Sequence, residues 1–281
     1  ATQAALNETL FALGNGQIGV RGAHDEGDVW AGTAQNDVFI NGFYESEPIV
    51  YPESAYGFAK ENQFIVRVPN ATGFTFSMDG EAFDPNLGVI SEYHKRLDFQ
   101  TGVLTRSFHW TAPSGKQVRV SSERLVSFTH MTVVAGRYAV TPLNFSGEVA
   151  ITSTVSNQPR AVKAGEDPRV GASLGGLLNF VAFTGDAEFS AFTHATHHSG
   201  LEVVTAVTHD ATPVRVAHDE QLASHGFTQD LAQNQTMSVA KFAAYISSQS
   251  VDPSQLVLAA QTALNAAKAV GFDGLVQLQT E

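Results

Sequence analysis

Residues 74–80 read Phe-Thr-Phe-Ser-Met-Asp-Gly, and this stretch decides the fold class. Apolar and polar side chains alternate through its first five positions, which is the period of a strand with one buried face. Asp-Gly then marks a two-residue hairpin turn, because both central residues of such a turn need a backbone conformation that Asp and Gly tolerate. The stretch therefore predicts an antiparallel hairpin.

The same kind of pattern recurs on both sides of this hairpin. Upstream, residues 64–68 form a β-branched run that stops at Pro-Asn. Downstream, residues 103–110, the Pro-Ser-Gly at 113–115 and the run at 118–121 predict a second hairpin. Strand-like runs then cover residues 131–140, 147–155, 176–183, 201–207, 214–217 and 238–248. Turn signals every 8–12 residues or so indicate a large antiparallel sandwich or barrel, so we predict a mainly β protein.

One segment near the end of the chain predicts a helix instead. Asp252 can cap the first free N–H groups, Pro253 suits the first helical position, and Gly271 suits the C-terminal cap. The apolar stripe consists of Leu256, Ala260, Leu264, Ala267 and Val270. Such a stripe must be buried against something. Two interpretations follow, a helix packed on the sandwich or a linker leading to another domain.

Composition excludes several classes of function. The 281 residues carry 28 acidic against 16 basic side chains, a net charge of −12, which argues against binding nucleic acid or an anionic membrane non-specifically. The cysteine count of zero excludes disulfides, thiol catalysis and cysteine-ligated metal sites. Apolar runs are too short for a transmembrane helix.

Ten histidines raise the hypothesis of a metal site. His194, His197 and His198 lie close together, and in a strand His194 and His198 would share a face. We interpret the three as a loop or surface cluster, with a metal site as the alternative. Residues 209–210 (His-Asp) and 218–220 (His-Asp-Glu) follow strand-like runs, so we interpret them as solvated turn residues.

Carboxylates and glycines in the first part of the chain raise two further hypotheses. An acid–base pair for glycosidic chemistry could come from Asp25, Glu26, Glu45, Glu47 and Glu53, but sequence gives no separation, and separation decides the mechanism. Residues 14–19 have the Gly-x-Gly-x-x-Gly spacing of dinucleotide loops. Ile and Val alternate with glycine here and no helix follows, so we expect a strand rather than a nucleotide site.

The same glycines carry a resemblance. Residues 8–22, Glu-Thr-Leu-Phe-Ala-Leu-Gly-Asn-Gly-Gln-Ile-Gly-Val-Arg-Gly, resemble the N-terminal region of glycoside hydrolase family 65. Further similar segments follow in the family's order at residues 40–45, 51–58, 97–106, 123–128, 166–169 and 271–274. The family contains maltose, trehalose, kojibiose and nigerose phosphorylases, with some trehalases and related hydrolases.

The resemblance implies a large antiparallel β-sandwich (a supersandwich, galactose-mutarotase-like), then a helical linker, an (α/α)6 barrel and a small β-domain. By this comparison residues 1–250 form the N-terminal sandwich domain, and residues 251–281 form a helical linker toward a barrel outside this sequence. In the family the general-acid Glu and the phosphate-binding residues lie in the barrel. No position here matches those motifs, so the resemblance assigns no catalytic residue to this chain.

The implied reaction is inverting phosphorolysis. A carboxylic acid protonates the glycosidic oxygen of an α-linked glucose disaccharide, and inorganic phosphate attacks the anomeric carbon to give β-glucose 1-phosphate. The resemblance implies phosphate as co-substrate, no other cofactor, no metal, a homodimer, a cytoplasmic location, and neither nucleic acid nor membrane as partner. The alternatives are a fragment of a family hydrolase such as trehalase, a free-standing carbohydrate-binding sandwich, or an enzyme with its own site using His194 and His198.

Residues 41–58 are the best candidate for a loop near the mouth of the active site. Aromatic faces beside carboxylates suit sugar stacking and hydroxyl recognition. We predict four substrate-adjacent residues, Tyr44, Glu53, Tyr56 and Phe58. The alternative is that the aromatic side chains fill the sandwich core or an interface with the barrel. We further expect Arg21 and Arg106 to pair with carboxylates, and Trp30 and Trp110 to be core or interface residues.

Overall fold

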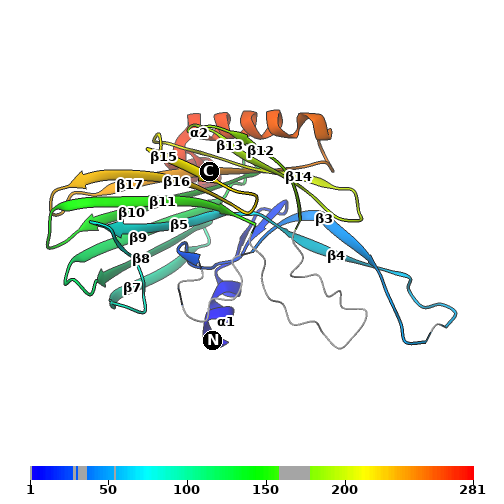
Figure 1. Ribbon diagram of the computed structural model, residues 1–281, viewed down its shortest axis with the longest axis horizontal. Coiled ribbons are helices and arrows are strands. Elements are labelled where there is room, and N and C mark those ends of the chain that lie inside the picture. Colours follow the sequence, from blue (N-terminus) through cyan, green and yellow to red (C-terminus); the bar gives the residue numbers. More distant parts are fainter. Residues whose placement is uncertain (1, 28–29, 31–36, 54, 158–177) are drawn as a thin grey trace.

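The computed structural model describes residues 2–27, 30, 37–53, 55–157 and 178–281 (Figure 1). The chain opens with helix α1 (Thr2–Leu10) and closes with helix α2 (Leu256–Thr280), and the described elements between them are strands, followed by a short 3₁₀ turn at Pro253–Gln255. Every strand pairing among them is antiparallel, so the predicted antiparallel β-fold with a C-terminal helix is confirmed.

Three sheets contain these strands. The order in the largest sheet is β12-β13-β14-β17-β10-β9-β8-β7. Its strands are β7 (Val89–Asp98), β8 (Val103–Thr111), β9 (Gln117–Val126), β10 (Val133–Pro142), β12 (Asn179–Gly185), β13 (Ser190–Ala195), β14 (Glu202–His209) and β17 (Met237–Ser247). The second sheet, β15-β16-β11-β5-β6, contains β5 (Asn70–Met78), β6 (Glu81–Ala82), β11 (Gly147–Ser156), β15 (Arg215–His218) and β16 (Leu222–Leu231). The third, β1-β2-β3-β4, contains β1 (Leu13–Gly14), β2 (Ile18–Val20), β3 (Val38–Pro48) and β4 (Glu61–Val68).

Local turn chemistry explains the hairpins. Asp79 and Gly80 connect β5 to β6 with φ of 46° and 80°, the left-handed pair that the Asp-Gly signal predicted. The glycine-rich string folds as the β1–β2 hairpin, in which the Asn15 side chain accepts N–H bonds from Gln17 and Ile18. No nucleotide loop forms there, in agreement with the sequence interpretation.

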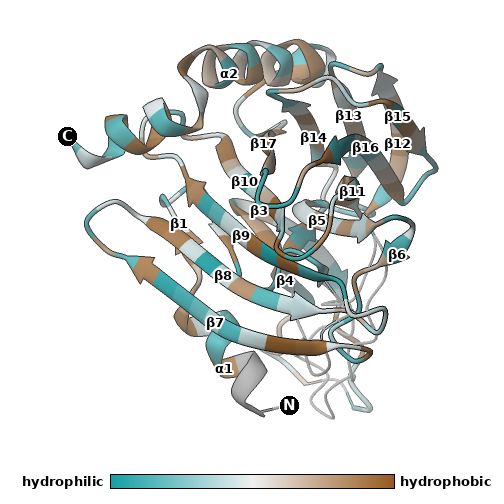
Figure 2. Cartoon of the chain, turned by 90° about the vertical axis from the view of Figure 1, so that its left-hand side faces the viewer, coloured by the Kyte–Doolittle hydropathy of each residue, from teal (hydrophilic) through white to brown (hydrophobic). Residues whose placement is uncertain are grey.

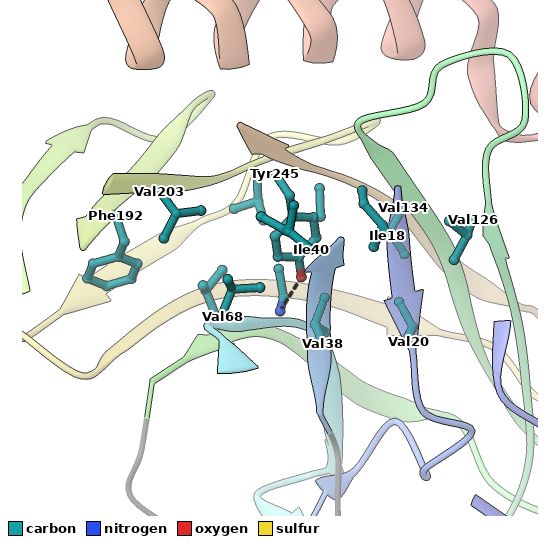
Figure 3. Packing of buried hydrophobic residues seen from close by; sticks show 14 of the residues in the cluster. Ile18, Val20, Val38, Ile40, Val68, Val126, Val134, Phe192, Val203 and Tyr245 are labelled. Atoms are coloured by element: carbon teal, nitrogen blue, oxygen red, sulfur yellow. Dashed lines mark hydrogen bonds between the residues drawn. The ribbon is translucent and has the colours of Figure 1, made fainter. Parts of the chain in front are cut away.

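The sheets enclose the core between them. One cluster joins the eight-stranded and five-stranded sheets through Phe76, Met78, Trp110 and Tyr138, and Trp110 is fully buried as expected. A second cluster packs the four-stranded sheet into the same interior, where Figure 3 shows Val38 and Ile40 of β3 against Val203 and Tyr245. The Tyr245 hydroxyl accepts a hydrogen bond of 3.0 Å from the Ala71 N–H and so keeps its polar atom satisfied inside this core.

Helix α2 covers the opposite face of the eight-stranded sheet (Figure 1). Four members of its predicted stripe (Leu256, Ala260, Leu264 and Ala267) are buried against β14 and β17, which confirms the interpretation of a helix packed on the sandwich. Val270 is still 37% exposed. Gly271 interrupts the helix with φ of 76°, as its capping role predicted, but a further helical segment follows to Thr280. None of the described helices is long and apolar enough to cross a membrane.

Two leucines of α2 provide a matched test of this packing. Leu264 is 1% exposed and Leu258 is 59% exposed, so the same substitution removes buried contacts at one site and few at the other. We expect Leu264→Ala to lower the free energy of unfolding by about 2–5 kcal/mol and Leu258→Ala by less than about 1 kcal/mol, as measured by urea denaturation. Equal effects would contradict the docking of the helix on the sheet.

Candidate functional site

A cluster of buried charged side chains lies on the inner face of the eight-stranded sheet. Arg106 of β8 donates to Asp25 at 3.0 Å and to Glu26 at 2.6 and 2.8 Å. Arg124 of β9 also pairs with Asp25, and the Tyr138 hydroxyl of β10 donates to Glu26 at 2.6 Å. All five side chains are buried, and the two carboxylates and two guanidinium groups pair with one another.

This pairing keeps Asp25 ionised. Burial favours the neutral acid, but Arg124, Arg106 and a hydrogen bond from Ser122 together hold the pKa of Asp25 well below its ordinary value. A general acid needs a raised pKa, so Asp25 is unsuited to protonate a glycosidic oxygen. The expectation that Arg106 pairs with carboxylates is confirmed. Arg21 likewise lies 4.0 Å from the Glu8 carboxylate.

A cavity of about 580 Å³ lies beside this cluster, between α1 and β7. Its wall includes His24, Trp30, Tyr93 and Lys95. The His24 ring stacks on Trp30 with 4.3 Å between centroids, and the Trp30 Nε1 donates to Glu26 at 2.9 Å. The ionic cluster therefore supports one wall of the cavity. Figure 2 shows β7 at the edge of its sheet with α1 beside it.

Burial sets the protonation of the groups that line the cavity. It lowers the pKa of His24 to about 3, with help from Arg106, and so keeps the imidazole neutral near pH 7. Burial, Arg124 and Arg106 lower the pKa of Lys95 to about 8, and the Lys95 ammonium donates to the Gly22 carbonyl. Burial raises the pKa of the Tyr93 hydroxyl to about 12, so Tyr93 is neutral as well.

The predicted substrate-adjacent residues lie on a long hairpin. Strands β3 and β4 extend together away from the body of the sandwich (Figure 1). The first half of the predicted loop is strand, because β3 continues to Pro48: Tyr44 lies in β3 and is half-buried. Glu53, Tyr56 and Phe58 lie in the connection between the strands, and all three are exposed.

The aromatic side chains of this segment therefore divide between two environments. Phe43 is fully buried in the core, as the alternative interpretation expected. Phe58 packs against Tyr51 with 4.8 Å between ring centroids, and Tyr56 is fully exposed. The aromatic side chains near the hairpin tip are thus available for contact with another surface.

Glu45 anchors the base of the hairpin, a role that the sequence did not indicate. Its carboxylate accepts backbone N–H bonds from His197, His198 and Ser199 of the β13–β14 turn. Burial opposes ionisation of Glu45, but these N–H groups and that of Ser46 hold its pKa below the ordinary value. The turn thus binds the hairpin through its backbone N–H groups. Among the described residues no group of three or more side chains that could hold a metal ion is found.

Two histidine interpretations were wrong. His194 lies inside β13 between Phe180 and Phe192 and is fully buried, not part of a surface cluster. His209 is the last residue of β14 rather than a solvated turn residue, and its Nε2 lies 2.8 Å from the Ser153 hydroxyl. In both cases strand alternation continues through the histidine and turns its ring inward.

The remaining predictions concern Asp219, Trp30 and residues 166–169. Asp219 forms a turn as expected and accepts N–H bonds from Gln221 and Leu222. Trp30 is half-buried at the cavity. Residues 166–169, which carried part of the resemblance, lie outside the described residues.

Comparison with known proteins decides the family. The sequence profile described as the N-terminal domain of glycosyl hydrolase family 65 matches residues 1–281. The chain belongs to glycosyl hydrolase family 65. Its family 65 relatives include the α,α-trehalose phosphorylase of Thermoanaerobacter brockii, 31% identical over 98% of this chain and 36% of that protein. An uncharacterized glycosyl hydrolase of Mycobacterium tuberculosis is 33% identical over 98% of this chain and 35% of that protein.

A solved structure extends the comparison to the fold of family 65. It is assigned provisionally as a kojibiose phosphorylase from the human microbiome and superposes with a TM-score of 0.87 at 16% identity. The match covers 99% of this chain and 36% of that one. This chain therefore spans about a third of the length of the relatives it matches, with their N-terminal domain fold.

Removal of Arg106 should destabilise the protein strongly. Arg106→Met leaves Asp25 and Glu26 buried without their shared partner, and loss of one member of a buried ion pair costs about 3–5 kcal/mol. The matched control is Arg96→Met, because Arg96 pairs with Asp98 at the surface, where such a pair contributes about 1 kcal/mol or less. Urea denaturation measures both, and a small effect for Arg106→Met would contradict the role of the cluster.

The buried His194 should make stability depend on pH. Burial lowers its pKa to about 4, below the unfolded value of about 6.5. Its stabilising contribution is therefore complete above pH 6.5 or so and is lost as the pH falls toward 4. When the pH is lowered from about 7 to about 5, we expect the free energy of unfolding of His194→Phe to fall by about 2 kcal/mol less than that of the unchanged protein. The control is His94→Phe, which makes the same substitution at an exposed position, and urea denaturation measures both variants.

Proposed function

We propose that this chain is the N-terminal domain of an inverting α-disaccharide phosphorylase that converts trehalose- or kojibiose-type α-glucosides to β-glucose 1-phosphate. The observation that carries the proposal is the match to the trehalose phosphorylase over 98% of this chain. The kojibiose phosphorylase of Halothermothrix orenii, 28% identical over 54% of this chain, supports the same reaction class.

In this proposal the reacting groups belong to the remainder of a longer protein. A carboxylic acid there protonates the glycosidic oxygen, and phosphate attacks the anomeric carbon from the opposite face with inversion. Phosphate is an anion, so it needs no general base, whereas a hydrolase needs a second carboxylate to activate water. The buried, ionised state of Asp25 and the anchoring role of Glu45 agree with chemistry located elsewhere.

The domain itself would support the catalytic barrel and a homodimer interface. The β3–β4 hairpin is its best candidate for contact with the active-site mouth. Val50, Tyr56, Phe58 and Ile65 expose apolar surface along it, beside the Glu53 carboxylate. Glu45 and the hydrogen bond from Gln249 Nε2 to the Gly42 carbonyl, 2.6 Å, fix the direction in which the hairpin leaves the body. We therefore propose that the tip closes against the reacting disaccharide.

Activity of the full-length protein tests this function. We expect trehalose or kojibiose with inorganic phosphate to yield β-glucose 1-phosphate, detected by NMR of the anomeric proton, with maltose as the third substrate tried. Omission of phosphate should abolish turnover. Release of glucose without phosphate would instead assign the protein to the hydrolases of the family.

The hairpin has its own test in the same full-length protein. Tyr56→Ala and Phe58→Ala should raise KM or lower kcat by roughly fivefold if each aromatic ring contributes about 1 kcal/mol of contact at the active site. The control is Val214→Ala, because Val214 is also an exposed apolar side chain and lies outside the hairpin. Unchanged kinetics in both hairpin variants would place the tip away from the substrate.

A further inference from the structure

We propose that the cavity between α1 and β7 binds an uncharged sugar, whose ring packs on the aromatic side chains of Tyr93 and Trp30. The cavity volume of about 580 Å³ lies within the range of about 300–1,000 Å³ that is usual for small-molecule sites. The inference goes beyond the proposed function, because it needs neither phosphate nor a second domain.

The first support is a bulge in strand β7. Glu92 and Tyr93 together oppose the single residue Phe108 of β8. Glu92 adopts φ of 50°, a left-handed conformation that disfavours non-glycine residues and is concentrated at functional sites. In a regular strand, residues 90 and 93 would point to opposite faces. The bulge places Ile90, Tyr93 and Lys95 together on the cavity wall.

The second support is a set of aromatic rings held in place before any ligand arrives. Trp30 packs between His24, at 4.3 Å, and Phe108, at 5.8 Å. Tyr93 meets the edge of Trp30 at 6.2 Å and is 39% exposed. Because the rings are fixed by their neighbours and by the bond from Trp30 to Glu26, a ligand would order few side chains on binding.

Polar groups surround this aromatic wall, and their positive and negative charges balance one another. Arg106 lies 3.1 Å from the His24 Nδ1 and can only donate, so Nδ1 accepts and the proton of the neutral ring lies on Nε2. The Lys95 ammonium is a second donor, and the Glu8 carboxylate, also at the wall, is an acceptor. Directly behind them the charges of Arg106 and Arg124 are matched by those of Asp25 and Glu26.

The charge balance selects the class of ligand. An anion such as phosphate would need an excess of unmatched positive charge, and a cation would need an excess of carboxylates. A neutral polyhydroxylated ring instead offers hydroxyl groups to both donors and acceptors, and an apolar face to Tyr93 and Trp30. The chemistry therefore fits a neutral mono- or disaccharide.

Calorimetric titration of the 281-residue chain tests this site, with glucose, maltose, trehalose and inorganic phosphate added separately. We expect saturable binding of at least one sugar and none of phosphate. Tyr93→Ala should weaken the affinity for the sugar by about tenfold. Phe99→Ala, at an aromatic residue that is 91% exposed in the connection between β7 and β8 and does not line the cavity, should leave the affinity unchanged.

A second variant keeps the test independent of folding. Asn7→Phe adds bulk at an exposed position of α1 on the cavity wall and leaves the aromatic rings of the wall in place. It should also abolish binding, with the thermal unfolding midpoint of each variant measured in parallel. Absence of sugar binding, an affinity that is unchanged in well-folded Tyr93→Ala and Asn7→Phe, or binding of phosphate in place of sugar would overturn the proposal.

Discussion

The ion pairs that join Arg106 to Asp25 and Glu26 are the interaction on which the rest of this structure depends. They tie the segment after β2 to the inner face of the eight-stranded sheet, across 80 and 81 positions of sequence. Two buried carboxylates would be intolerable without the two guanidinium groups that neutralise them. Once paired, they fix His24 and Trp30 and so shape the cavity beside α1.

A buried carboxylate whose charge is compensated also fixes the β3–β4 hairpin. Glu45 is a buried carboxylate, and its charge is balanced not by a cation but by three N–H groups of one turn. Such an arrangement directs the hairpin, because the carboxylate can satisfy the turn in one position only. Helix α2 covers the outer face of the large sheet mainly with apolar contacts, joined by an ion pair between its Asp273 and Arg137 of β10. The buried carboxylate anchors and the cavity lie on the inner side and at the sheet edge.

Sequence predicted strands with one buried face, such as β11, and strands buried on both faces, such as β14 and β17, because both kinds are rich in apolar and β-branched residues. Strand β7 was not predicted, since its residues at the sheet edge include Ser-Glu-Tyr-His-Lys-Arg and are mostly exposed. Its bulge has no sequence signature, because Glu92 takes a conformation usually occupied by glycine. Strand β3 was interpreted in part as a loop, because its apolar alternation is broken by a register shift between Phe39 and Tyr44.

The sequence alone determined the family, the antiparallel fold class, the Asp79-Gly80 turn and the closing helix, because each depends on residues that are neighbours along the chain. Tertiary structure decided which side chains meet. Glu45 reaches a turn more than 150 positions away, and His194 enters the core, through strand register that spacing along the chain does not reveal. A contact between distant strands is set by the packing of whole sheets. The sequence around a carboxylate does not reveal whether that carboxylate anchors a turn, neutralises an arginine or faces a sugar.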